Sequence, residues 1–277
     1  MLSTHDHSRD SAGMKYVYPV ISRRAGGVSV GINLNTNNAC NWGCIYCQVP
    51  NLTRGGPPAI DLPRLEAELR QFLHDAIFGD FLEQNAPREA RRLVDVAFSG
   101  NGEPTSASEF PEAVEIAANV LSEFDLLETL TLRVITNGSL LHRSSTKHGI
   151  ARIGTIGGEV WFKIDRATSQ AIALVNGAQT TPEKIRKNVL ACAQLAPTWI
   201  QSCFFSIDGN TIDESEFSAY LDLISSIREQ IKGVHVYGLA RPSLQPEAKR
   251  LSALNAESLM SFSQRIAALG VNVVTNP

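Results

Sequence analysis

The sequence has little cysteine, no long apolar run and no excess of charge of either sign. Its 277 residues include five cysteines. It has 25 Lys and Arg residues and 28 Asp and Glu residues, which gives a net charge of −3. A small, odd cysteine count argues against a disulfide framework and is typical of a reducing compartment, so we expect a cytoplasmic protein. No apolar stretch approaches the roughly 18 residues of a membrane span, so we expect no membrane partner. Nucleic-acid binders usually carry a basic excess, so nucleic acid is not favoured as a partner.

The composition is otherwise that of an ordinary globular protein, with 43% hydrophobic and 19% charged residues. The N-terminal stretch MLSTHDHSRDSAGMK is polar and lacks the apolar segment of a secretory signal. We therefore expect residues 1–27 to form a partly disordered leader. The remainder, 28–277, is long enough for one large α/β domain.

Strand-like apolar runs alternate with helical patterns through this domain. The first run, VSVGINLN, spans residues 28–35, and residues 61–78 have helical spacing, with Asp61 placed to cap the helix. Six or seven such steps with short links predict a parallel sheet with right-handed crossovers. An open doubly wound sheet and a full or partial barrel both fit. In either, functional groups gather at the C-terminal ends of the strands.

Three of the five cysteines lie in CNWGCIYC, directly after the first predicted strand. Cys40, Cys44 and Cys47 are close enough in sequence to hold one metal centre. A structural zinc site commonly has four protein ligands, and no fourth Cys or His lies nearby in the sequence. On a [4Fe–4S] cluster, three thiolates leave one iron open to a ligand that the protein does not supply. A zinc site completed from a distant part of the chain is the alternative.

This loop resembles the C-x3-C-x-aromatic-C loop of the radical S-adenosylmethionine (SAM) superfamily, with Tyr46 at the aromatic position. The resemblance implies a partial (β/α)6 TIM-like barrel with parallel strands and a [4Fe–4S] cluster whose open iron binds SAM. It also implies that the reduced cluster cleaves SAM to a 5′-deoxyadenosyl radical, which abstracts a hydrogen atom. Such chemistry needs an external low-potential electron donor of the flavodoxin or ferredoxin type.

Two later strand ends carry groups that suit this cofactor. In FSGNGEPT, glycines permit close approach of the backbone, and Glu103 supplies a carboxylate suited to an ammonium group. The stretch resembles the family's GGEP motif, which implies that Asn101, Gly102 and Glu103 bind the methionine end of SAM; Asn101 replaces the first glycine. In VITNGSL, Asn137 lies in a TNG sequence that family members often have near the cofactor, although a plain turn also explains it.

Four further residues are candidates at the strand ends. Lys163 and Asp165 in WFKID share one face of a strand, where they contact cofactor or substrate, or else form a buried ion pair. Arg241 in YGLARPS suits an acidic substrate group, with a surface ion pair as the alternative. Cys203 would face a radical site as a hydrogen donor, although a lone cysteine is more often a small buried apolar residue.

The RPS and SGNGEPT sequences resemble a sub-group related to the wyosine-forming, tRNA-modifying enzymes. Those enzymes carry further cysteines for a second cluster before the main loop, whereas this chain has none upstream of Cys40. We therefore predict a radical SAM enzyme that abstracts hydrogen from a small-molecule substrate. A tRNA-modifying radical SAM enzyme and a non-catalytic, metal-stabilised binding module are the alternatives.

Overall fold

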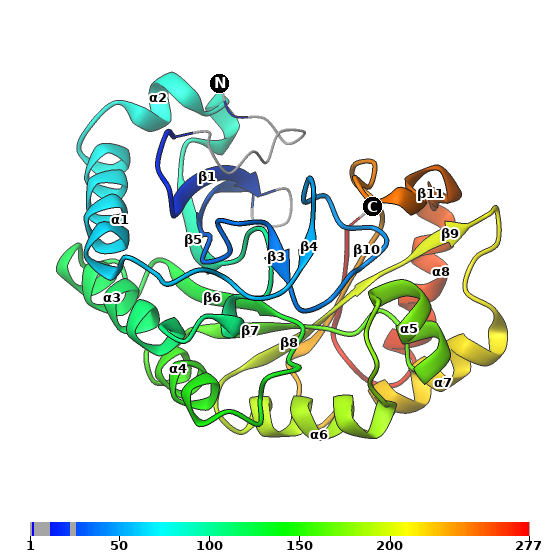
Figure 1. The fold of residues 1–277 in the computed structure, drawn as a ribbon. Helices are drawn as coiled ribbons and strands as arrows, with labels where there is room; N and C mark the ends of the chain where they lie inside the picture. The colour runs from blue at the N-terminus through cyan, green and yellow to red at the C-terminus, as the bar shows by residue number, and fades with distance from the viewer. Residues whose placement is uncertain (1, 3–11, 23–25, 277) are drawn as a thin grey trace.

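A curved sheet of eight strands forms the centre of the protein (Figure 1). The computed structural model describes residues 2, 12–22 and 26–276. The strands follow one another across the sheet in chain order, and all but the first run parallel. They are β1 (Val17–Ser22), β2 (Gly27–Ile32), β5 (Leu93–Phe98), β6 (Thr131–Thr136), β7 (Glu159–Lys163), β8 (Thr198–Cys203), β10 (Gly233–Tyr237) and β12 (Val273–Asn276).

Helices follow the parallel strands and cover the convex side of the sheet, so the predicted partial (β/α)6 barrel is confirmed (Figure 1). The helix that begins after Asp61 starts as predicted, because the Asp61 side chain accepts a hydrogen bond from the backbone N–H of Arg64. The helices are α1 (Leu62–Ile77), α2 (Phe81–Asn85), α3 (Phe110–Glu123), α4 (Ser144–Thr155), α5 (Ser169–Asn176), α6 (Pro182–Ala193), α7 (Glu214–Ser225) and α8 (Ala256–Ala267). No helix in the described ranges is both long and apolar enough to cross a membrane.

Four short strands lie outside the main sheet. They form two small pairs, β3 (Ala39–Cys40) with β4 (Thr53–Arg54), and β9 (Phe205–Ile207) with β11 (Leu251–Ala253). Because β9 pairs with β11, the sequence WIQSCFFSID, which reads as one strand, divides between two sheets. Three short 3-10 helices complete the described structure, η1 (Arg88–Ala90), η2 (Pro104–Ser106) and η3 (Pro246–Arg250).

The two faces of the sheet differ in chemistry. On the convex face, Phe98 of β5 packs edge-on against Phe110 of α3, with ring centroids 5.7 Å apart, inside the main hydrophobic core. On the concave face, the same strand carries Asp95, its neighbour β6 carries Arg133, and β8 carries Gln201. Strands of a parallel sheet that are buried on both faces are usually apolar throughout. A polar inner face therefore indicates a cavity.

The first strand lies within the region expected to be a leader. β1 pairs antiparallel with β2 over its whole length, because VYPVIS supplies apolar side chains to the core. The carboxylate of Glu68 on α1 accepts hydrogen bonds from the backbone N–H groups of Lys15 and Tyr16, at 3.0 and 2.7 Å, and so fixes the entry to the strand. The expected disorder at residues 3–11 and 23–25 concerns positions outside the described residues.

Candidate active site

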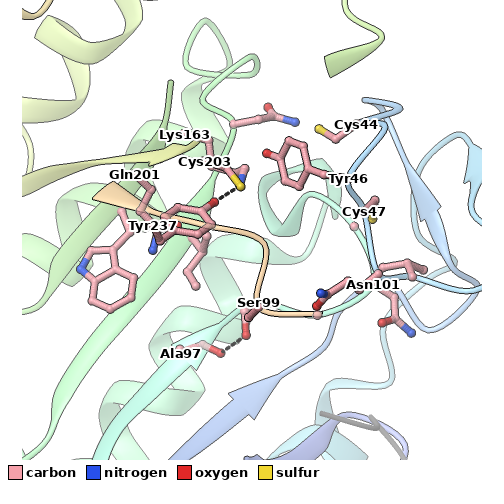
Figure 2. Close-up of a pocket in the computed structure, with 18 of the residues that line it drawn as sticks. Cys44, Tyr46, Cys47, Ala97, Ser99, Asn101, Lys163, Gln201, Cys203 and Tyr237 are labelled. Atoms are coloured by element: carbon pink, nitrogen blue, oxygen red, sulfur yellow. Dashed lines mark hydrogen bonds between the residues drawn. The ribbon is translucent and has the colours of Figure 1, made fainter. Parts of the chain in front are cut away.

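A cavity of about 370 Å³ opens on the concave side, at the C-terminal ends of the strands (Figure 2). Every predicted site residue except Asp165 lines it. These residues are Cys40, Cys44, Tyr46, Cys47, Asn101, Gly102, Glu103, Asn137, Lys163, Cys203 and Arg241. The fold thus brings together side chains that are up to 201 positions apart in the chain, from Cys40 to Arg241. This convergence is what the strand-end rule predicts for a barrel.

The three cysteines of the loop are free thiols, and each is half-buried. Burial raises the pKa of the Cys40 thiol to about 11 and that of Cys44 to about 12, although hydrogen bonds to the sulfurs oppose the shift. Iron would therefore have to displace protons from these thiols on binding. Within the described residues, no three His, Cys, Asp or Glu side chains converge closely enough for a single metal ion. Thiolates are the ligands that proteins supply to [4Fe–4S] clusters, and the three thiols line one cavity, so the chemistry of the donor set fits such a cluster.

The sulfur atoms of Cys40 and Cys44 each accept a hydrogen bond from a nitrogen atom. The backbone N–H of Trp42 lies 3.4 Å from Cys40 Sγ, and Asn176 Nδ2 lies 3.4 Å from Cys44 Sγ. Asn176 ends α5, and its backbone oxygen also accepts from Gly43 at 2.9 Å. Hydrogen bonds to cluster sulfurs are one of the means by which proteins set reduction potentials. The end of α5 thus fixes the path of the cysteine loop through Gly43 and donates a hydrogen bond to the sulfur of Cys44.

Asp165 holds this loop rather than lining the cavity. Its side chain is 1% exposed, and Oδ2 accepts from Tyr46 Oη at 2.5 Å and from Asn176 Nδ2 at 2.8 Å. Oδ1 accepts from the backbone N–H of Cys203 at 2.9 Å. Among the described residues it forms no ion pair with Lys163, so the expected alternative of a buried Lys–Asp pair is not what the structure contains. Asp165 instead connects the cysteine loop to the ends of β7 and β8.

The Asn101–Glu103 loop packs directly on the cysteine loop. Gly102 is required there, because a Cβ atom would lie 2.3 Å from the backbone oxygen of Ala39. Asn101 Nδ2 donates to Asn38 Oδ1 at 2.7 Å, so the residue that replaces the first glycine ties the two loops together. Gly100 has a φ of +127°, which a residue with a side chain rarely adopts.

Glu103 is the N-cap residue of η2 and is buried, only 3% exposed. Burial raises the pKa of its carboxyl group, against the opposing effect of hydrogen bonds. Oε1 accepts from the hydroxyls of Thr105 and Thr136, each at 2.6 Å, and Oε2 accepts from the backbone N–H of Asn137 at 2.7 Å. The Asn137 side chain in turn donates to Asn41 Oδ1 at 2.9 Å. Two strand ends and the cysteine loop are therefore fixed to one another through polar contacts.

Lys163 projects into the cavity from the end of β7 (Figure 2). Its Nζ donates to Tyr237 Oη at 2.8 Å and lies 5.0 Å from the centre of the Tyr46 ring. Burial lowers the pKa of this amine, but the nearby Tyr237 oxygen and the Asp165 carboxylate outweigh that effect and raise its pKa. Cys203, 1% exposed, also lines the cavity, and burial raises the pKa of its thiol.

The segment that begins at Arg241 is hydrogen-bonded to the cysteine loop at several points. The Ser243 hydroxyl donates to the backbone oxygen of Ile45 at 2.7 Å, and Gln245 Nε2 donates to that of Val49 at 2.9 Å. The backbone oxygen of Arg241 accepts from Gln48 Nε2 at 3.0 Å. The sequence identified Arg241 but not its neighbours, because their contacts are made with residues about 200 positions earlier.

No protein-family model matches the sequence. Among curated proteins, UPF0026 protein MJ1312 of Methanocaldococcus jannaschii is 27% identical over 156 residues, and GTPase Obg of Brachyspira hyodysenteriae is 23% identical over 148 residues. Each match covers 53% of this chain, but it covers 43% of the first protein and 19% of the second. The chain thus matches less than half the length of these curated relatives.

Solved structures are similar over most of the chain. TYW1 with a lysine–pyruvate adduct bound has a TM-score of 0.60 at 13% identity, over 95% of this chain and 78% of that one. A radical SAM methyltransferase from Sphaerobacter thermophilus has a TM-score of 0.63 at 14% identity, over 94% and 68%. The protein anSMEcpe with bound AdoMet has a TM-score of 0.54 at 17% identity, over 88% and 63%. The chain therefore has the partial-barrel fold found in radical SAM enzymes.

Proposed function

We propose that this chain is a radical SAM enzyme that reductively cleaves S-adenosylmethionine at a [4Fe–4S] cluster held by Cys40, Cys44 and Cys47. The observation that carries the proposal is the opening of these three thiols into one cavity, at the edge of the sheet where barrel enzymes place their chemistry. When bound, the cluster and SAM would supply a 5′-deoxyadenosyl radical for hydrogen abstraction from a small-molecule substrate. The shared fold supports this reading.

The chain's own residues would bind and orient the cofactor. Trp42 and Asn176 would donate hydrogen bonds to the cluster-binding sulfurs. Glu103 Oε2 accepts one hydrogen bond among the described residues, from Asn137, and so keeps a lone pair for the methionine ammonium of SAM. Asn101 and Gly102 bring the backbone of their loop close to the same place. An external flavodoxin- or ferredoxin-type protein would supply the electron.

A non-catalytic, metal-stabilised binding module is the rival from another class. A structural metal site needs no carboxylate at the next strand end, yet Glu103 is buried there beside the thiols. It also needs no ammonium group in the adjoining cavity, where Lys163 lies. Charged groups in a half-closed cavity are costly to keep unless they serve a ligand, so they favour the enzyme.

The test is anaerobic reconstitution with iron and sulfide, followed by addition of SAM and dithionite. We expect broad visible absorption and 5′-deoxyadenosine from the wild type, and the loss of both in Cys44→Ala. Cys192→Ala is the matched control, because this buried thiol on α6 belongs to the core and does not line the cavity. Uptake of zinc with no cluster, or equal 5′-deoxyadenosine formation by wild type and Cys44→Ala, would refute the proposal.

A further inference from the structure

Four neighbouring strands contribute polar side chains to one part of the cavity. Lys163 on β7 lies opposite Gln201 on β8, and Tyr237 on β10 lies opposite Asn276 on β12. Since β8 also pairs with β10, these residues occupy successive strands, and all four line the cavity. Figure 2 shows the side chains of Lys163, Gln201 and Tyr237 together, close to Tyr46 of the cysteine loop. We call these four residues the polar recess.

Two side-chain amide nitrogen atoms in the recess have no hydrogen-bond partner within the described residues. Gln201 is 2% exposed, and its Nε2 atom is buried without a hydrogen bond. The Nδ2 atom of Asn276 is buried and unpartnered in the same way. Buried polar groups of folded proteins almost always have a hydrogen-bond partner, because leaving them without one is costly. Two such groups in one cavity indicate that a ligand supplies the missing acceptors.

Lys163 adds a charge to these donors. An ammonium group has three N–H donors, and the one hydrogen bond in the structure uses one of them, on Tyr237. In the described part of the chain Lys163 forms no ion pair, whereas Arg133, the other cation of β6 and β7 on this face, is paired with both Asp95 and Glu159. Lys163 is thus a half-buried positive charge with no carboxylate in direct contact among the described residues, although the nearby Asp165 carboxylate also stabilises it. An anion is the ligand that would satisfy it.

We propose that the polar recess binds the carboxylate of a small substrate, a deepening of the proposed function on which it rests. Lys163 supplies the charge, and Gln201 and Asn276 supply neutral N–H donors. Within the recess the one cation is Lys163, although Arg241 also lines the cavity. A phosphate dianion would bring a second negative charge towards the carboxylates of Asp95 and Glu159, which share one cation, Arg133, and this is unfavourable. The recess adjoins Tyr46, so a substrate held there lies beside the cysteine loop.

SAM also carries a carboxylate, so the experiment must separate the two sources. Trifluoroacetate, a singly charged carboxylate with a fluorine signal, is titrated into the reconstituted wild type with saturating SAM and observed by 19F NMR. We expect the signal to broaden and to sharpen again with excess acetate but not with inorganic phosphate. Gln201→Leu should weaken binding about tenfold, which corresponds to about 1.4 kcal/mol. Replacing an unpartnered buried amide with leucine keeps the volume and does not endanger folding.

Gln264→Leu on the exposed surface of α8 is the matched control and should bind as the wild type does. Equal binding by Gln201→Leu and the wild type would overturn the proposal. So would trifluoroacetate binding that occurs only when SAM is left out, which would assign the recess to the cofactor, or displacement of trifluoroacetate by phosphate at the acetate concentration. Cluster absorbance and 5′-deoxyadenosine formation are measured on the same wild-type preparation. A failure of the proposed function appears in those two measurements, and a failure of the recess appears in the titration.

Discussion

Asp165→Asn tests whether one buried carboxylate holds the cysteine loop in place. The aspartate accepts three hydrogen bonds, from Tyr46, from Asn176 and from the backbone of Cys203. Asparagine has almost the same shape and keeps one carbonyl oxygen, which can still accept from the Cys203 N–H. The new NH2 group, however, faces the donors of Tyr46 and Asn176. The Tyr46 hydroxyl can turn and accept, but the Asn176 amide nitrogen cannot.

The expected cost follows from that count. One buried donor is left without an acceptor, which costs about 1–3 kcal/mol of unfolding free energy. For a protein somewhat above 250 residues, each kcal/mol lowers the melting temperature by about 2–4 °C, so we expect a fall of roughly 2–12 °C. Asn176 also donates to Cys44, so the loss of its acceptor should disturb the thiol as well.

Thermal unfolding of the metal-free protein measures the effect, with Asp222→Asn on exposed α7 as the control. Tyr46→Phe and the double variant complete a cycle, and contacting residues of such a network typically show coupling of about 0.5–3 kcal/mol. Equal melting temperatures for Asp165→Asn and wild type, or a coupling of zero, would refute the idea that this carboxylate anchors the loop. A melting point lowered as much by Asp222→Asn would do so too.

Three further perturbations test separate contacts. Gly102→Ala should abolish stable iron binding, because its Cβ would lie 2.3 Å from a backbone oxygen of β3; Gly56→Ala, where a Cβ meets nothing within 4 Å, is the control, and iron content is the measurement. Ser243→Ala should cost about 1 kcal/mol of unfolding free energy in urea, because the hydrogen bond to the Ile45 oxygen is lost. Glu68→Gln should be less stable than wild type at neutral pH, a difference that disappears in acid.

The sign of the Glu68 effect follows from its pKa. Burial raises the pKa of this carboxyl group, but hydrogen bonds from Lys15, Tyr16 and Arg64 outweigh it and lower the pKa overall. A folded pKa below the unfolded value of about 4.3 stabilises the protein above that value, and the contribution is lost as pH falls through the folded pKa. Urea unfolding between pH 7 and pH 3 measures it. A gap between wild type and Glu68→Gln that stays constant over this range would contradict the assignment. Wild-type iron content in Gly102→Ala would contradict the need for glycine at that position. An unchanged urea midpoint in Ser243→Ala would contradict the stabilising role of the Ser243 hydroxyl.

The sequence predicts the half-barrel and most of the cavity because their signals are local. Period-two strands, the cap at Asp61 and the loops at strand ends are each encoded in a few neighbouring residues. The contacts that hold the site together are not. Asn176 reaches Cys44 across 132 positions, and Gln245 reaches Cys47 across 198. Nothing in the sequence near Asn176 or Gln245 indicates either contact, since both depend on how the sheet curls.

Asp165 shows how an alternation pattern misleads at the end of a strand. It shares a face with Lys163 only while the strand continues, and β7 ends at Lys163. Beyond that point the chain turns, so Lys163 lies in the cavity while Asp165 lies behind the cysteine loop. Similarly, a stretch that looked like a leader forms β1, because its alternate side chains complete the core below α1.

The polar side chains on the inner face of the sheet fall into two groups: those that bond to one another, and those whose donors have no partner within the described residues. Towards the N-terminal ends of the strands, Arg133 joins Asp95 to Glu159, and Ser29 and the Trp161 indole N–H complete the hydrogen bonding of those carboxylates. That network uses only groups of the protein. One level nearer the cysteine loop, the amides of Gln201 and Asn276 lack such partners. Since one part of the sheet, β2 and β5 to β7, satisfies its polar groups while β8 and β12 do not, the unsatisfied part reflects a site prepared for a ligand rather than a sheet that tolerates buried polar atoms.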